Sequence, residues 1–158
     1  MEKRNRWSAK LAAGLAALGL LAAAPVQAQD TSQAEKLRRL DIMLMVTGLR
    51  CRTTPDNFQA DFANFEAAHL SALNAAAAEL RDGLVARYGV GGAPRALDRI
   101  STGMANEYGQ GHPWLDCADL RIVTRSLAQM RGTPALVEAA DQLLAVSGSS
   151  TQLAWARR

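Results

Sequence analysis

The chain has 158 residues, of which 49% are hydrophobic and 21% charged, and its formal net charge is +3. Residues 1–28 hold four of the eighteen Lys and Arg residues and one of the fifteen Asp and Glu residues, so fourteen of each remain and the rest of the chain is neutral overall. A neutral chain of about 130 residues suffices for one domain, and its charge favours neither nucleic acid nor an anionic membrane surface as a partner.

The first 28 residues have the composition of a secretory signal peptide. Residues 1–10 carry four basic side chains and one acidic one, and an uncharged run rich in Ala and Leu extends from Leu11 to Pro25. Small residues at Val26 and Ala28 predict cleavage after Ala28 and a periplasmic or secreted protein. The alternative is an uncleaved membrane anchor. Because the apolar run is shorter than the roughly 20 residues of a bilayer span, we expect no stable membrane insertion after cleavage.

Ser32 and Glu35 have the spacing of a capping box, in which both side chains satisfy amide groups at a helix start. The spacing predicts a helix from Ser32 to about Leu49, which the segment Thr53–Pro55 ends. Thr54 followed by Pro55 then predicts the start of the next helix, since a hydroxyl can cap it and proline is tolerated in its first turn.

The stretch from Pro55 to Tyr88 is predicted to be a long helix, which Gly83 could bend or end. Its apolar side chains recur at steps of three and four residues, which is helical spacing. We expect this stripe to organise the fold, with the other helices covering it. Its members are Phe58, Phe62, Phe65, His69, Ala72, Leu73, Ala76, Leu80 and Leu84.

Further helices are predicted at about 94–108, 113–131 and 134–146, separated by breaks rich in glycine and proline at 89–94, 109–113 and 132–134. Residues 29–146 would form one domain and residues 147–158 a flexible C-terminal tail. Because no segment shows sustained alternation of apolar and polar residues, no strand is predicted. The fold class is therefore all-α, an antiparallel up-and-down bundle of four to five helices.

The chain contains two cysteines, Cys51 and Cys117. In an up-and-down bundle, the first helix ends where the helix after residue 113 begins, so the two cysteines would meet. An even number of cysteines in an exported protein favours a disulfide between them. The alternative is that Cys51 is a reactive thiol whose pKa is lowered by Arg50 and Arg52.

The segment from Leu44 to Arg52, which reads LMVTGLRCR, is followed by Phe62, Phe65, His69 and the pair Leu73–Asn74. This pattern resembles a group of small exported proteins of alphaproteobacteria. The resemblance implies export but no activity.

Two clusters contain side chains that could carry chemistry. Glu66 and His69 have the Glu-x-x-His spacing of di-iron bundles, but such sites need a second copy that the chain lacks. His112 and Asp116 lie beside Cys117, where an acid–base site is conceivable. The competing interpretations are a hydrogen-bonded histidine at the edge of the core for His69, and a capped helix start for Asp116.

No copper, haem, nucleotide or other cofactor is predicted. Met43 and Met45 point about 200° apart on a helix, so they cannot converge on one copper ion, and the sequence has no Cys-x-x-Cys-His motif for covalent haem. We therefore predict a non-enzymatic periplasmic protein that binds a partner protein, a small apolar ligand or an unfolded client chain. The alternative is an enzyme or a metal- or haem-binding protein centred on Glu66 and His69 or on His112. The sequence does not predict the oligomeric state.

Overall fold

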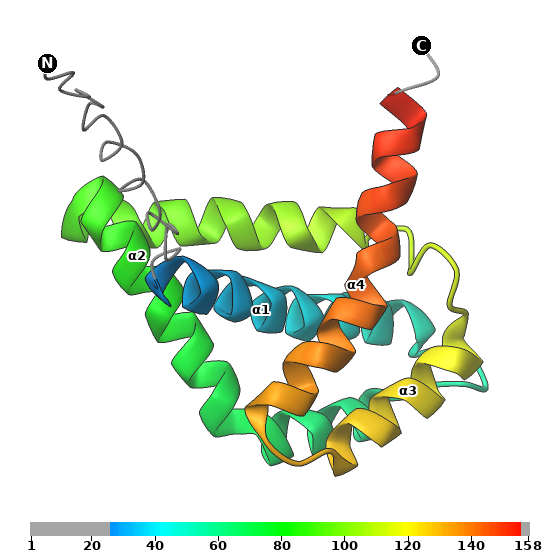
Figure 1. Ribbon diagram of the computed structural model, residues 1–158. Coiled ribbons are helices and arrows are strands. Elements are labelled where there is room, and N and C mark those ends of the chain that lie inside the picture. Colours follow the sequence, from blue (N-terminus) through cyan, green and yellow to red (C-terminus); the bar gives the residue numbers. More distant parts are fainter. Residues whose placement is uncertain (1–25, 156–158) are drawn as a thin grey trace, which may run out of the picture.

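The computed structural model describes the backbone of residues 26–155 and the side chains of residues 33–144. Within these limits the chain forms four helices and no strand (Figure 1). They are α1 (Val26–Cys51), α2 (Gln59–Glu107), α3 (Cys117–Gln129) and α4 (Thr133–Trp155). The all-α fold is therefore confirmed, whereas the up-and-down order and a fifth helix stay predictions. Among the described residues, no helix is both long enough and apolar enough to cross a membrane.

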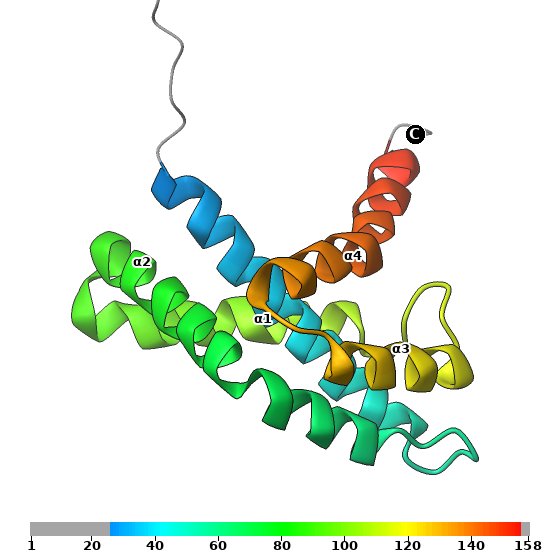
Figure 2. The same cartoon turned by 60° about the horizontal axis from the view of Figure 1, so that its bottom comes forward.

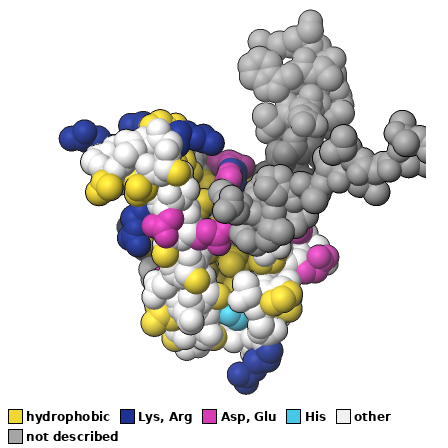
Figure 3. Space-filling model, turned by 60° about the vertical axis from the view of Figure 1, so that its left-hand side comes forward, with side chains coloured by type: hydrophobic (Ala, Val, Ile, Leu, Met, Phe, Trp, Pro, Cys, Tyr) yellow, Lys and Arg dark blue, Asp and Glu magenta, His cyan; other side chains and the backbone are white. Residues whose placement is uncertain are grey.

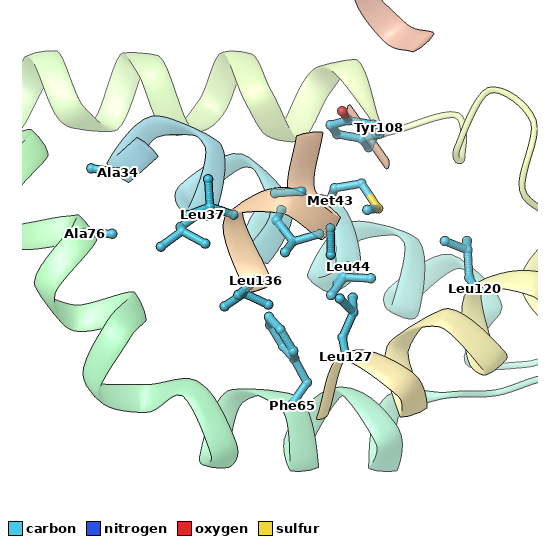
Figure 4. Packing of buried hydrophobic residues seen from close by; sticks show 14 of the residues in the cluster. Ala34, Leu37, Met43, Leu44, Phe65, Ala76, Tyr108, Leu120, Leu127 and Leu136 are labelled. Carbon is cyan, nitrogen blue, oxygen red and sulfur yellow. The ribbon is translucent and has the colours of Figure 1, made fainter. Parts of the chain in front are cut away.

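The helix at the centre of the fold is α1, and not the stretch from Pro55 to Tyr88. α1 contacts α2, α3 and α4, and Figures 1 and 2 both show α4 crossing it. Leu40, Met43 and Leu44 have no exposed surface, and Figure 4 shows Met43 and Leu44 surrounded by side chains of the other helices. α1 can take this position because its apolar residues cover more than one face, so it can be buried on several sides at once.

The long helix α2 consists of two arms that meet at Gly89. This residue has φ 69° and ψ 168°, which lie outside the helical region, and Figure 1 shows the chain turning back there. The first arm (59–88) is continuous through Gly83, and the second arm (90–107) contains Pro94. A single residue therefore replaces the loop predicted at 89–94. The predicted helix at 94–108 is the second arm.

Two helices begin later than their sequence signals predict. α2 begins at Gln59 because residues 52–58 form a turn, in which the Thr54 hydroxyl donates to the Cys51 carbonyl and the Asn57 side chain accepts from the Gln59 amide. Phe58, the residue just before α2, is fully buried, and its ring lies against Gly48 of α1, which holds this turn in place. α3 begins at Cys117 because Asp116, together with Asp119, forms a capping box there.

The outer ends of α1 and α4 extend beyond their predicted bounds. α1 begins at Val26, since no glycine or proline interrupts the residues before the capping pair at Ser32. α4 begins at Thr133, as the Thr133–Pro134 pattern predicts, and continues to Trp155 through residues predicted to be a flexible tail. Residues 1–25 of the predicted signal peptide lie outside the described residues.

The cysteines at the end of α1 and the start of α3 lie within bonding distance. The sulfur atoms of Cys51 and Cys117 are 2.02 Å apart and their Cα atoms 5.7 Å apart. The predicted pairing is thus confirmed, and in this bonded form Cys51 is not a free thiol.

Candidate functional site

His69 lies on the first arm of α2, where it joins this arm to α3. Its side chain is 7% exposed, and the ring of Phe65 packs against it with the ring centroids 5.2 Å apart. The Nε2 atom lies 2.8 Å from the carbonyl oxygen of Leu127. Because a carbonyl oxygen can only accept a hydrogen bond, Nε2 carries the proton and donates it. In a neutral ring, Nδ1 is then an acceptor, and it has no hydrogen-bond partner among the described residues.

A groove of about 320 Å3 opens beside His69, between the first arm of α2 and the turn that joins α3 to α4. We call it the His69 groove. Its lining side chains are small apart from that of His69, and three of them carry polar atoms, namely those of His69, Ser71 and Thr133. The lining residues are Ala68, His69, Ser71, Ala72, Ala75, Gly132 and Thr133.

Glu66, one turn before His69, is exposed and is not part of the groove lining. Its charge acts instead on Asp41 of α1. Burial raises the pKa of the Asp41 carboxyl; the neighbouring Arg38 guanidinium opposes this shift, and the Glu66 carboxylate adds to it. The guanidinium of Arg38 lies 3.3 Å from a carboxylate oxygen of Asp41, and its other terminal nitrogen donates to the Ser101 hydroxyl at 3.4 Å. The two residues of the Glu-x-x-His pair therefore act at different places: Glu66 on Asp41 of α1, and His69 on Leu127 of α3.

His112 lies in the connection between α2 and α3 and is 8% exposed. Its Nδ1 accepts a hydrogen bond from the Leu115 amide at 3.2 Å, and its Nε2 lies 3.4 Å from the Leu143 carbonyl oxygen of α4. The ring stacks on Tyr108 and meets the edge of Trp114. Burial lowers the pKa of His112, and the hydrogen bond to Leu143 opposes this shift. Both ring nitrogens are therefore already used within the fold.

A second cavity, of about 210 Å3, lies over the Cys51–Cys117 disulfide, and we call it the disulfide pocket. It is lined by Arg50, His112 and Asp116, of which the sequence places His112 and Asp116 beside Cys117. The Asp116 carboxylate accepts from the Asp119 amide at 2.9 Å as the cap of α3, and Arg50 donates to the Gly109 carbonyl oxygen at 3.0 Å. The Arg50 guanidinium thus binds a backbone carbonyl.

The two cavities differ in what they offer a ligand. In the disulfide pocket, Arg50, His112 and Asp116 already bond to the protein, so a ligand would have to compete with these bonds. The His69 groove is lined by a histidine that has one ring nitrogen without a partner among the described residues, and by small apolar side chains. The apolar stripe in the sequence includes His69 but gives no sign of Ser71 or Thr133. The sequence feature that could have indicated the groove is the spacing of Ala68, Ala72 and Ala75, which puts three small side chains on one face of α2.

In the part of the chain that the structure describes, no group of three or more His, Cys, Asp or Glu side chains is arranged to hold a metal ion. Comparison with protein-family models, curated proteins and solved structures finds no match to this chain.

Proposed function

We propose that this protein is exported to the periplasm and acts there as a non-enzymatic binding protein that holds a small ligand in the His69 groove. The observation that carries the proposal is the groove itself, with its alanine walls and the unpaired Nδ1 of His69. Export is supported by the signal-like composition of residues 1–28 and by the resemblance to small exported proteins of alphaproteobacteria. The Cys51–Cys117 bond supports it too, since disulfides persist in oxidising compartments.

The lining indicates which chemical class of ligand the groove would take. Ala68, Ala72 and Ala75 offer apolar surface without long side chains, which suits a flat or narrow apolar body. Nδ1 of His69 accepts a hydrogen bond in the neutral ring, so a ligand that donates one gains a bond that a pure hydrocarbon cannot make. The ligand is therefore a small, largely apolar molecule with a hydroxyl or similar donor.

Fluorescence titration with 1-naphthol, an apolar ring system with one hydroxyl, tests the groove directly. Ala68→Phe places a ring in the groove and should abolish saturable binding. Ala67→Phe is the matched control, because Ala67 is also an exposed alanine of α2 but does not line the groove. Naphthalene, which lacks the hydroxyl, should bind about tenfold more weakly than 1-naphthol, since the difference is one hydrogen bond.

Two results would contradict the groove as the binding site. The first is absence of saturable 1-naphthol binding in a folded, disulfide-bonded protein. The second is equal loss of binding in the Ala67→Phe and Ala68→Phe variants, which would mean that any added ring disturbs the protein regardless of its place.

Export is tested by the intact mass of protein recovered from the periplasmic fraction. We expect a chain that begins at Gln29, because small residues precede this position at the predicted cleavage site. A membrane-bound chain whose mass includes residues 1–28 would make the protein an anchored one. This measurement tests only where the protein is located, whereas the fluorescence titration tests the groove as a binding site.

A second candidate function, acid–base chemistry or metal binding, is favoured by the meeting of Arg50, His112 and Asp116 in the disulfide pocket. Its weakness is that both nitrogens of His112 are engaged with the backbone. Metal analysis of the natively purified protein separates the two candidates. Stoichiometric metal or haem would favour the second candidate over a non-enzymatic binding protein.

We also infer an up-and-down order in which the two arms of α2 count as separate helices. The support is that Cys51 at the end of α1 bonds to Cys117 at the start of α3. An outgoing and a returning arm between these positions would place both cysteines at one end of the fold.

A further inference from the structure

The end of the molecule where α2 turns back has a small core of its own. Leu84 of the first arm packs with Ala93 and Ala96 of the second arm, separately from the main core. The arms also approach closely beside the turn, because a Cβ added to Gly92 would lie 3.0 Å from the Cβ of Tyr88. This end, residues 80–100, is called the α2 tip below. This packing holds the two arms together at the turn.

Two large apolar side chains stand exposed on either side of Gly89 at the α2 tip. Val90 is 79% exposed, more than any other large hydrophobic residue whose side chain the structure describes, and Tyr88 is 48% exposed. The core beneath the turn is formed by Leu84, Ala93 and Ala96, and neither Tyr88 nor Val90 belongs to it. The tip therefore presents an aromatic ring and an aliphatic side chain to whatever it meets.

Four exposed arginines lie in the same segment as these two residues, together with two acidic residues, Asp82 and Asp98. Among the described residues, none of the four has an ion pair or hydrogen bond through its side chain. They are Arg81, Arg87, Arg95 and Arg99.

Several arginines elsewhere in the fold are paired with carboxylates, whereas Arg50 binds a backbone carbonyl and the exposed Arg52 and Arg131 have no side-chain partner among the described residues. Arg39 binds Glu107, and Arg125 binds Asp61 through two nitrogens. Figure 3 brings the side of the α2 tip forward and shows Lys and Arg side chains together with hydrophobic ones at the upper end of the molecule. The tip is thus a local excess of positive charge on a chain that is neutral overall after residue 28.

We propose that the α2 tip docks on an anionic lipid surface, with Tyr88 and Val90 in the headgroup layer and the arginines on lipid phosphates. Aromatic side chains favour the membrane interface, and guanidinium groups pair with phosphates through two hydrogen bonds. Basic residues near an anionic leaflet add attraction that weakens within a Debye length. A surface contact of this kind needs no membrane-spanning helix.

The shape of the tip favours lipid over a protein partner. A stable protein interface buries about 800 Å2 on each side, and it usually centres on a cluster of anchor residues. The tip offers Tyr88 and Val90 beside its turn and the less exposed Ile100 on its second arm, with charged side chains exposed on both arms. A lipid surface adapts its headgroups to such a shape, whereas a protein partner would need a matching cavity.

Co-sedimentation with vesicles tests the proposal, using the exported form of the protein with its N-terminus verified by mass. We expect binding to vesicles that contain phosphatidylglycerol, little binding to pure phosphatidylcholine, and a loss of binding as salt rises. Tyr88→Ser combined with Val90→Ser, and Arg87→Gln combined with Arg95→Gln, should each weaken binding roughly tenfold.

Matched controls come from exposed residues of the same kinds elsewhere. Ile122 of α3 is 62% exposed, and Arg131 is exposed without a partner among the described residues. Ile122→Ser and Arg131→Gln should leave vesicle binding unchanged. The proposal fails if the protein ignores anionic vesicles, or if the controls lose binding as much as the tip variants. Tip-dependent binding to polyglutamate without binding to vesicles would also overturn it, in favour of an acidic protein partner.

Discussion

Phe65 has no exposed surface, whereas Phe62, one turn earlier on α2, is only partly buried. We therefore expect Phe65→Ala to lower the free energy of unfolding by about 3–5 kcal/mol, a large share of the roughly 5–15 kcal/mol of such a domain. Denaturant unfolding monitored by circular dichroism measures the change. Leu70→Ala is the control, because Leu70 lies on the same helix but is 57% exposed. Equal effects at both positions would contradict the burial of Phe65.

His112 should make the fold sensitive to acid. Burial lowers its pKa below the usual 6.5, so the unfolded chain binds a proton more readily than the folded one. The stability from the neutral ring is thus fully present above pH 6.5 and is lost as the pH falls toward the lowered pKa. Melting temperature measured against pH should fall on acidification in the wild type and change less in His112→Gln. Parallel profiles for the two proteins would contradict this.

At the scale of the helix, Gly89 and Gly83 should respond to the same substitution with opposite signs. Gly89 has a positive φ of 69° in a region that other residues avoid, so Gly89→Ala should lower stability by about 1–3 kcal/mol. Gly83 lies within the first arm with no atom within 4 Å of an added Cβ, so Gly83→Ala should raise stability by roughly 0.5–1 kcal/mol. Thermal unfolding compares the two variants. A stabilising Gly89→Ala substitution would mean that the helix does not turn at this residue.

For the molecule as a whole, the Cys51–Cys117 bond ties the central helix to α3 across a sequence separation of 66 residues. In the chain-entropy model, replacing both cysteines by serine should cost about 4 kcal/mol, because the unfolded chain regains the freedom that the closed loop removed. Helical content well below the melting temperature should not change, since the helices do not depend on the bond for their backbone hydrogen bonds. Circular dichroism and denaturant unfolding measure both quantities.

The control for this variant is the wild-type protein under reducing conditions, which should match the double serine variant in stability. Labelling of two free thiols per chain in the denatured, unreduced wild type would refute the bond. It would also remove the main support for the up-and-down order of the helices.

Local chemistry in the sequence was enough to predict the helical fold class and several helix ends. α4 starts at Thr133 and Pro134, since the fixed φ of proline suits the first turn of a helix whatever the rest of the chain does. The glycines at 89–92 likewise predicted a break. In the structure, Gly89 alone leaves the helix, and Gly91 and Gly92 stay in it. The sequence could not show this, because Leu84 packs against Ala93 and Ala96 only in the folded chain.

For the candidate site, the sequence by itself determined that His69 belongs to an apolar stripe and that His112 and Asp116 lie near Cys117. It could not show that His69 donates to Leu127, 58 residues away, or that Thr133 completes the groove, because such contacts depend on how the helices pack. The same limit explains why α1 and not α2 is central. Periodicity shows which face of a helix is apolar. How many other helices pack against that helix depends on how all the helices fill the core together, which is a property of the tertiary structure.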